Sequence, residues 1–260
     1  MNTLVVLALV LFILMLTIGG EKGARSFVAI FLNFLAVMVS IVIMMMPQAN
    51  PIVVTLIACM VISCINLFFI NEINTKTKTA FLASILTIFV LLVFIWWMTD
   101  VSMIQGFGEE EVEELGVFSL YIGTDFVKIA ASVIIMSTIG AITDAAMAIS
   151  SPMFEMRYHH PNASRKELFM FGIQIGKDIL GTSANTLFFA FFGGYMALLI
   201  WFKDLDYSLG EIINSKIFSS EMITIFCAGT GVALVIPVTA WITAYFFTRV
   251  KKKQPSESME

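Results

Sequence analysis

Charged residues are scarce in this chain, and no segment is polar enough to form a soluble domain. Lysine, arginine, aspartate and glutamate make up 13% of the 260 residues, whereas hydrophobic residues make up 59%. With a mean hydropathy of +0.93, the chain has too little polar surface to cover a soluble globule. This composition excludes a soluble enzyme and predicts an integral membrane protein that contacts the lipid bilayer.

Cysteine and histidine are also rare. The three cysteines all lie in apolar runs, so we expect neither a disulfide nor a metal site from them. The two histidines, His159 and His160, are adjacent and have no carboxylate or cysteine at ligand spacing, which argues against a metal site there. No basic patch interleaved with aromatic residues is present, so nucleic acid is not an expected partner. We expect no cofactor.

Seven apolar runs approach or exceed the roughly 17 to 25 residues that a spanning helix needs. They are Thr3–Ile18, Phe27–Met46, Ile52–Ile70, Ala80–Met98, Phe126–Ser151, Ile179–Phe202 and Met222–Phe247. The first run lacks the basic start and small-residue exit of a signal peptide, so we interpret it as a helix. The prediction is an all-α bundle of about seven transmembrane helices, one domain over residues 1–248, followed by a basic and then polar cytoplasmic tail over 249–260.

The distribution of positive charge predicts the orientation. Placing the N-terminus outside and the C-terminus inside puts twelve basic residues on the cytoplasmic side, where the positive-inside rule favours them. They are Lys22, Arg25, Lys76, Lys78, Arg157, Arg165, Lys166, Lys177, Arg249, Lys251, Lys252 and Lys253. The loop after the fourth run is acidic, with Asp100, Glu109, Glu110, Glu111, Glu113 and Glu114. We interpret it as a solvated outer loop in preference to a cation or partner site.

An aspartate interrupts the fifth apolar run. Asp144 lies in the sequence GAITDAAMAISS at residues 140–151. Ionisable groups inside a bilayer are costly, face protein or water, and are functional candidates. Asp144 belongs to a set of small and polar residues that recur with the period of one helical face. The set is Ser137, Gly140, Asp144, Ala148, Ser151 and Glu155. We expect this face to pack on another helix or to line a wet cavity.

The sixth run carries a second polar face, formed by Asp178, Thr182, Asn185 and Thr186. Asp144 and Asn185 each lie about 10 Å from the cytoplasmic ends of their runs. We therefore expect Asn185 and Thr186 to hydrogen-bond Asp144, with Lys177 and Asp178 closer to the cytoplasmic interface. Ser164 and Glu167 form a capping box, which predicts a short helix that starts at Arg165 and leads into this run.

These residues resemble a known family. Residues 140–151, Glu155, and the sequence GIQIGKDILGTSANTL at 172–187 are similar to the YibE/F family of bacterial multi-pass membrane proteins. The chain resembles the YibF-like short form, which has no added extracytoplasmic domain. In the family Thr143 is commonly replaced and Lys177 is often arginine. The resemblance implies a multi-pass protein of the bacterial cell membrane that works with a YibE-like membrane partner or as a homo-oligomer.

A more distant similarity links the chain to SecD and SecF of the resistance-nodulation-division superfamily. There an intramembrane aspartate is followed by an acidic residue, an amphipathic cytoplasmic helix and a polar start to the next helix, as Asp144, Glu155 and residues 177–185 are here. The loop after the second run is only five residues, 47–51, where that superfamily inserts a substrate-handling domain. The similarity implies a bundle arranged like half of such a transporter, and it is an argument from fold alone.

Three classes of function follow. The leading hypothesis is a proton-responsive subunit of a transport or export complex, in which Asp144 gains and loses a proton. The second is a membrane scaffold, in which a neutral Asp144 and the polar faces only hold helices together. The third is an intramembrane hydrolase, with Ser150, Ser151, Asp144 or Asp178 as candidate groups. Because no histidine or lysine lies at the right depth to act as a base for a serine, we expect no enzymatic activity.

Overall fold

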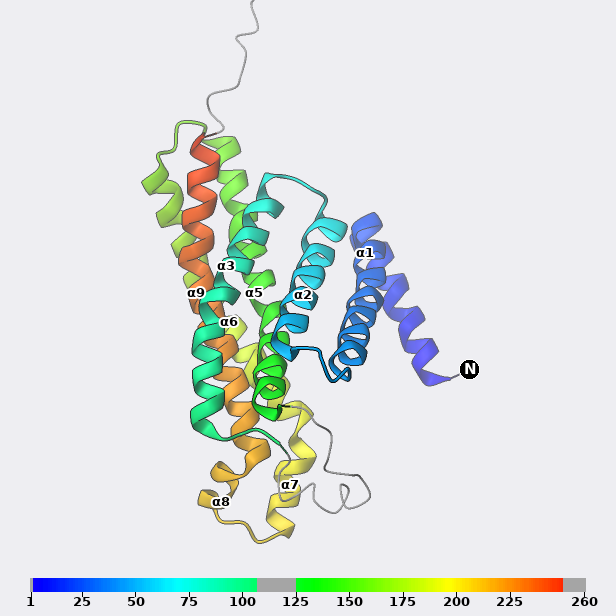
Figure 1. Ribbon diagram of the computed structural model, residues 1–260. Helices are drawn as coiled ribbons and strands as arrows, with labels where there is room; N and C mark the ends of the chain where they lie inside the picture. Colours follow the sequence, from blue (N-terminus) through cyan, green and yellow to red (C-terminus); the bar gives the residue numbers. More distant parts are fainter. Residues whose placement is uncertain (1, 107–124, 250–260) are drawn as a thin grey trace, which may run out of the picture.

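The computed structural model describes residues 2–106 and 125–249, and this part of the chain is helical and contains no strand. In chain order the elements are α1 (Thr3–Met44), α2 (Pro51–Cys64), the π-helix η1 (Ile65–Phe69), α3 (Thr75–Ser102), α5 (Phe126–His159), α6 (Arg165–Gly194), α7 (Met196–Asp204), α8 (Leu209–Asn214) and α9 (Lys216–Arg249). The long helices lie side by side as a bundle, and α7 and α8 sit at one end of it (Figure 1).

The helices have the length and composition that a bilayer requires. Five of those described are long and apolar enough to cross a membrane: α1, α2 with η1, α3, α5 and α9. The pair α6 and α7 is a sixth when it is counted as one span, although it is bent by 51°. The predicted run Ile179–Phe202 therefore contains a bend, at Tyr195, between two helices. The predicted number of seven is reached only if α1 is divided into two crossings.

Helix α1 is folded back on itself at Gly20. This residue has φ 57° and ψ −138°, which is not helical. The rings of Phe12 and Phe27 lie 5.0 Å apart, whereas 15 residues of straight helix would separate them by about 22 Å. A methyl group added to Gly23 would collide with the carbonyl of Met15 on the other arm. The break coincides with the gap between the predicted runs Thr3–Ile18 and Phe27–Met46, and Figure 1 shows the two arms of this hairpin at the edge of the bundle.

Polar side chains cap the helix starts, because the first backbone N–H groups of a helix have no partner within it. Asn50 caps α2, which has Pro51 in its first turn, and Asp125 caps α5. The capping box predicted from Ser164 and Glu167 is confirmed. The helix that begins there is longer than predicted, because α6 continues without interruption from Arg165 into the span.

The core lies around α5 and α9, which pack against each other and against both α3 and α6. Leu91, Ile142 and Val232 belong to a cluster between α3, α5 and α9 and are fully buried. A second cluster includes Met153, Leu168 and Ala240, from α5, α6 and α9. Helix α1 contacts the rest of the described chain mainly through α2 and η1. It is therefore a peripheral element, and α5 and α9 are central ones.

Successive helices alternate in direction. The turn of α1, the link between η1 and α3, the link between α5 and α6, and the end of α9 lie at one end of the bundle (Figure 1). The links from α1 to α2 and from α7 to α9 lie at the opposite end. Most of the basic residues predicted to be cytoplasmic occur in or next to the first group of links. The predicted acidic outer loop, with Glu109 to Glu114, and the predicted cytoplasmic tail after Arg249 lie outside the described residues.

Candidate functional site

The polar face predicted on α5 exists, and it points away from the core of the chain. Asp144 and Ala148 are exposed, whereas Ile142, Ala146 and Ile149, on the opposite side of the helix, are buried. The remaining members behave in the same way. Ser137 and Glu155 are exposed, and Gly140 and Ser151 are partly exposed. A methyl group added to Gly140 would meet no atom within 4 Å, so this face is open along its length.

The polar face of α6 is open in the same sense. Asp178, Thr182, Asn185 and Thr186 are all exposed, as is Lys177. The opposite side of α6 is the buried one, and it is closely packed. A methyl group on Gly172 would lie 2.8 Å from Cβ of Ala240, and one on Gly176 would collide with Cγ2 of Ile236. The side of α6 that carries Gly172 and Gly176 therefore packs against α9, and the polar side is exposed.

The predicted hydrogen bonds between Asp144 and the next helix are not made, which corrects that expectation. Thr186 donates to the carbonyl of Thr182 at 2.9 Å, and Thr182 donates to the carbonyl of Ile179 at 2.9 Å. Neither hydroxyl reaches another helix. Asp144 and Asn185 have no hydrogen bond or ion pair with any residue that the structure describes. Both side chains point outward from the isolated chain.

The packing of α5 against α6 also corrects the depth at which these groups lie. A methyl group on Gly172 would be 2.6 Å from Sδ of Met153, so these two residues are near the same level in the antiparallel pair. Moving nine residues along each helix brings Asp144 level with Gly181. Asn185 lies about 6 Å farther from the end at which α5 connects to α6, at 1.5 Å per residue. Asp144 is closer in depth to Asp178 and Thr182 than to Asn185.

Asp144 is near the middle of a long helix. It lies 15 residues before the end of α5 and 18 residues after its start, so about 22 Å of helix separates it from one end and about 27 Å from the other. An aspartate at the centre of a spanning helix costs about 2.5 to 3.5 kcal/mol on insertion scales, because hydrocarbon cannot solvate it. Contact of this face with lipid is therefore unfavourable, which makes Asp144 a candidate functional residue.

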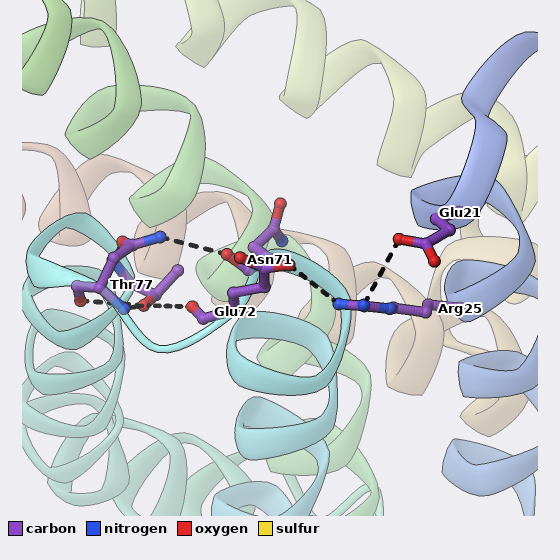
Figure 2. A network of polar contacts seen from close by, with 6 residues as sticks. Glu21, Arg25, Asn71, Glu72 and Thr77 are labelled. Atoms are coloured by element: carbon purple, nitrogen blue, oxygen red, sulfur yellow. Dashed lines mark hydrogen bonds and ion pairs between the residues drawn. The ribbon is translucent and has the colours of Figure 1, made fainter.

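Two polar contacts between α1 and the neighbouring helices belong to the supporting structure. Nδ2 of Asn33 donates to Oδ1 of Asn66 at 2.7 Å, which joins α1 to η1. Figure 2 shows the second contact, in which Arg25 lies 3.2 Å from Glu72 and 3.7 Å from Glu21.

The ion pair of Arg25 and Glu72 was not predicted. Glu72 has a positive φ of 62° in the link between η1 and α3, and its carbonyl accepts a hydrogen bond from the hydroxyl of Thr77 at 2.9 Å. The residues are 47 positions apart in the sequence, so no spacing pattern connects them. Their ion pair connects the α1 segment just after its turn to the link that precedes α3 (Figure 2).

Metal-ligand clusters are absent from the described residues, where no three histidine, cysteine, aspartate or glutamate side chains come together. His159 and His160 are both exposed and line an open pocket together with Glu167. Ser150 is fully buried, and its hydroxyl is 3.5 Å from the carbonyl of Met147 in its own helix.

The long apolar helices and the absence of strands in the described chain define an all-helical, multi-pass membrane protein. Comparison with family models agrees with this class. Residues 7–249 match the model of YibE/F-like proteins, and the chain belongs to that family. Neither the curated proteins nor the solved structures include a match to the chain.

Proposed function

We propose that this chain is a subunit of a proton-responsive transport or export complex in the bacterial cell membrane, and that Asp144 is the group that titrates. The observation that carries the proposal is the open polar face of α5, with a carboxylate near the middle of the helix. A carboxylate that reaches neither a cation nor a hydrogen-bond donor among the described residues needs a partner protein or water. Carboxylates in that setting form proton relays in pumps and transporters.

The polar face of α6 completes the proposed site. Lys177 and Asp178 lie about one helical turn toward the cytoplasmic end from the level of Asp144, by the register that Gly172 and Met153 define. Thr182 lies close to that level, and Asn185 and Thr186 lie farther toward the outer end. We propose that these residues shape the environment of Asp144 once a partner covers both faces. Gly140, Ser151 and Glu155 support the same surface on α5.

The proposed partner is a YibE-like membrane protein, with a homo-oligomer as the alternative. A second bundle laid on the open faces would resemble the arrangement of the two halves of a resistance-nodulation-division transporter. In this proposal the chain crosses the membrane seven times, with each arm of α1 as one crossing, the N-terminus outside and the C-terminus inside. The short link between α1 and α2 has no room for a substrate-handling domain, so the partner would supply substrate contacts.

The test is proton flux in vesicles that contain this chain and the partner that purifies with it. We expect Asp144→Asn to abolish a pH-gradient-driven response and Asp204→Asn, an exposed carboxylate on α7 outside both polar faces, to retain most of it. Recovery of the partner and the amount of inserted protein are measured in each variant. A normal flux for Asp144→Asn in correctly inserted protein would exclude the coupling role.

A scaffold function is the second candidate, because an open polar face also suits a protein that only assembles others. In that case Asp144→Asn would lower the amount of partner recovered, and no pH-dependent activity would be present to lose. Asp144→Leu separates the two functions further, since it removes hydrogen bonding together with charge. A scaffold would tolerate Asn much better than Leu, whereas a proton-coupled subunit would lose activity with both.

A further inference from the structure

An apolar pocket lies outside the polar faces, between the second arm of α1, the start of α2 and the first half of α5. Its volume is about 550 Å³, and its wall is almost entirely apolar. Val37, Met44, Ile129, Val133 and Met136 are among the lining residues. Methionine side chains are flexible and fill irregular apolar spaces, so this wall can adapt to a flexible ligand. The volume is in the range of small-molecule sites in proteins.

Four hydroxyl residues line the pocket, and three of them are satisfied within their own helices. Ser40 donates to the carbonyl of Ala36 at 2.7 Å. Thr55 and Ser137 likewise donate to carbonyls four residues earlier, at 2.8 and 2.9 Å. Ser132 differs, because its Oγ has no hydrogen-bond partner among the described residues although the residue is only 3% exposed. A buried hydroxyl without a partner costs free energy, which a ligand with an acceptor would remove.

The position of Ser132 indicates where such a ligand comes from. The residue lies seven positions after Asp125, which caps α5 and forms a 3.0 Å ion pair with Lys128 at the end of the helix. Ser132 is therefore about 10 Å along the helix from that polar end, at the outer margin of the hydrocarbon layer. An acyl chain of a phospholipid has an apolar tail, and its ester carbonyl is a hydrogen-bond acceptor at this margin.

We propose that this pocket is a binding site for one acyl chain of a phospholipid from the adjacent leaflet, with Ser132 donating to its ester carbonyl. A neighbouring groove between α1 and α2 provides a comparison within the same chain. It has a volume of about 410 Å³ and is also apolar, and Ser40 is its one hydroxyl residue. That hydroxyl is already paired, so the groove offers lipid contact without a hydrogen bond. The proposal does not depend on the role of Asp144, which lies twelve residues farther along α5.

The test uses the purified chain in phosphatidylcholine vesicles that contain a small fraction of phosphatidylcholine with a photoactivatable diazirine on its acyl chain. After irradiation, mass spectrometry locates the labelled residues. We expect label on the segment from Ile129 to Met136 several-fold above that on the segment from Val54 to Val61. Ser132→Ala should lower the label at the first segment about fivefold, as expected for one lost hydrogen bond. Ser63→Ala, which removes an equally buried and unpaired hydroxyl outside the pocket, should leave it unchanged.

A matched pair of bulky substitutions tests the location. Val133 and Val61 are exposed valines that line the pocket and the groove respectively. Val133→Phe should fill the pocket and remove its label, whereas Val61→Phe should leave that label unchanged. The proposal would be overturned if both segments were labelled equally and neither Val133→Phe nor Ser132→Ala changed that labelling. Such a result would mean unspecific contact with the surrounding lipid. Disulfide-linked dimers of Val133→Cys would identify a second copy as the occupant and overturn it as well.

Discussion

The side chains of Asn33 and Asn66 join α1 to η1 through a hydrogen bond of 2.7 Å inside the apolar part of the bundle. Because α1 has few other polar contacts with the rest of the described chain, this amide pair and the ion pair of Arg25 with Glu72 fix how the N-terminal hairpin sits against the other helices. Hydrogen bonds between membrane helices contribute about 0.6 kcal/mol on average and up to about 1.7 kcal/mol. The hairpin is therefore held by modest forces.

The amide pair predicts a measurable coupling energy. In a double-mutant cycle, Asn33→Ala and Asn66→Ala should each destabilise the protein, and their coupling free energy should be about 1 kcal/mol. The measurement is unfolding in mixed micelles with increasing sodium dodecyl sulfate. Ser40→Ala serves as the control, because its hydroxyl bonds within α1 and should show no coupling with Asn66. Strictly additive effects of the two asparagine substitutions would contradict the contact.

The turn of α1 depends on the backbone of Gly20. A residue with a side chain is strained at φ 57° and ψ −138°, and we expect Gly20→Ala to destabilise the hairpin by about 1 to 3 kcal/mol. Crosslinking between cysteines placed at Phe12 and Phe27 reports whether the two arms still meet. Gly19→Ala is the matched control, since neither glycine has an atom within 4 Å of an added methyl group and only Gly20 has a positive φ. Equal crosslinking yields in the two variants would argue against this turn.

The contact between α6 and α9 depends on the absence of a side chain at residue 176. We expect Gly176→Ala to cost about 1 to 3 kcal/mol, because its methyl group would overlap Ile236 and the helices would have to separate. Ile236→Ala in the same chain should recover part of this loss, which denaturant titration can measure. Gly181→Ala, on the open side of α6, should be neutral or slightly stabilising. A clear loss of stability for Gly181→Ala would show that its face is already covered.

The capping box of α8 predicts a local pH dependence. Hydrogen bonds with the side chain and the backbone of Ser208 lower the pKa of Glu211 below its usual 4.5. A lowered pKa in the folded state means that the cap is fully stabilising above about pH 4.5 and that this stabilisation is lost as the pH falls through the lower, folded value. After correction for the intrinsic rate, amide hydrogen exchange of residues 209–214 should therefore speed up only as the pH falls below about 4.5.

Glu211→Gln provides the control for this prediction. Glutamine can form the same capping box without titrating, so hydrogen exchange in the variant should have no pH-dependent step. An unchanged step in Glu211→Gln would assign the titration to another group.

Hydropathy predicted the spans well, because a bilayer demands long apolar segments and little else resembles them. The start of α6 was also predictable, since Ser164 and Glu167 satisfy backbone groups that are three residues apart and need no distant partner. The bend at Tyr195 directly follows Gly193 and Gly194, and a pair of glycines favours a break in a helix, but the hydropathy pattern alone does not show it. Residues 179–202 are apolar enough on average to be taken as one run despite Thr182, Asn185 and Thr186, and hydropathy does not respond to a change in helix direction.

The candidate site was predictable only in part, for a related reason. Periodicity determined that Ser137, Asp144 and Ser151 share one face of α5. It could not determine which neighbour that face meets, because this depends on how α6 is rotated. In the structure α6 turns Gly172 and Gly176 toward α9, and its polar residues face outward. Because the two polar faces lie at similar depth, the sequence suggested that they contact each other within the chain. In the structure both faces are instead exposed.

The conformation of Gly20 also affects the number of times the chain passes through the bilayer. If each arm of α1 crosses, that number is odd, and the two ends of the polypeptide lie in different compartments. A straight α1 would make the number even, with both ends on the same side. Reporter proteins fused to the two ends would distinguish these cases, so the backbone angles of one glycine decide where the first residue of the chain is located.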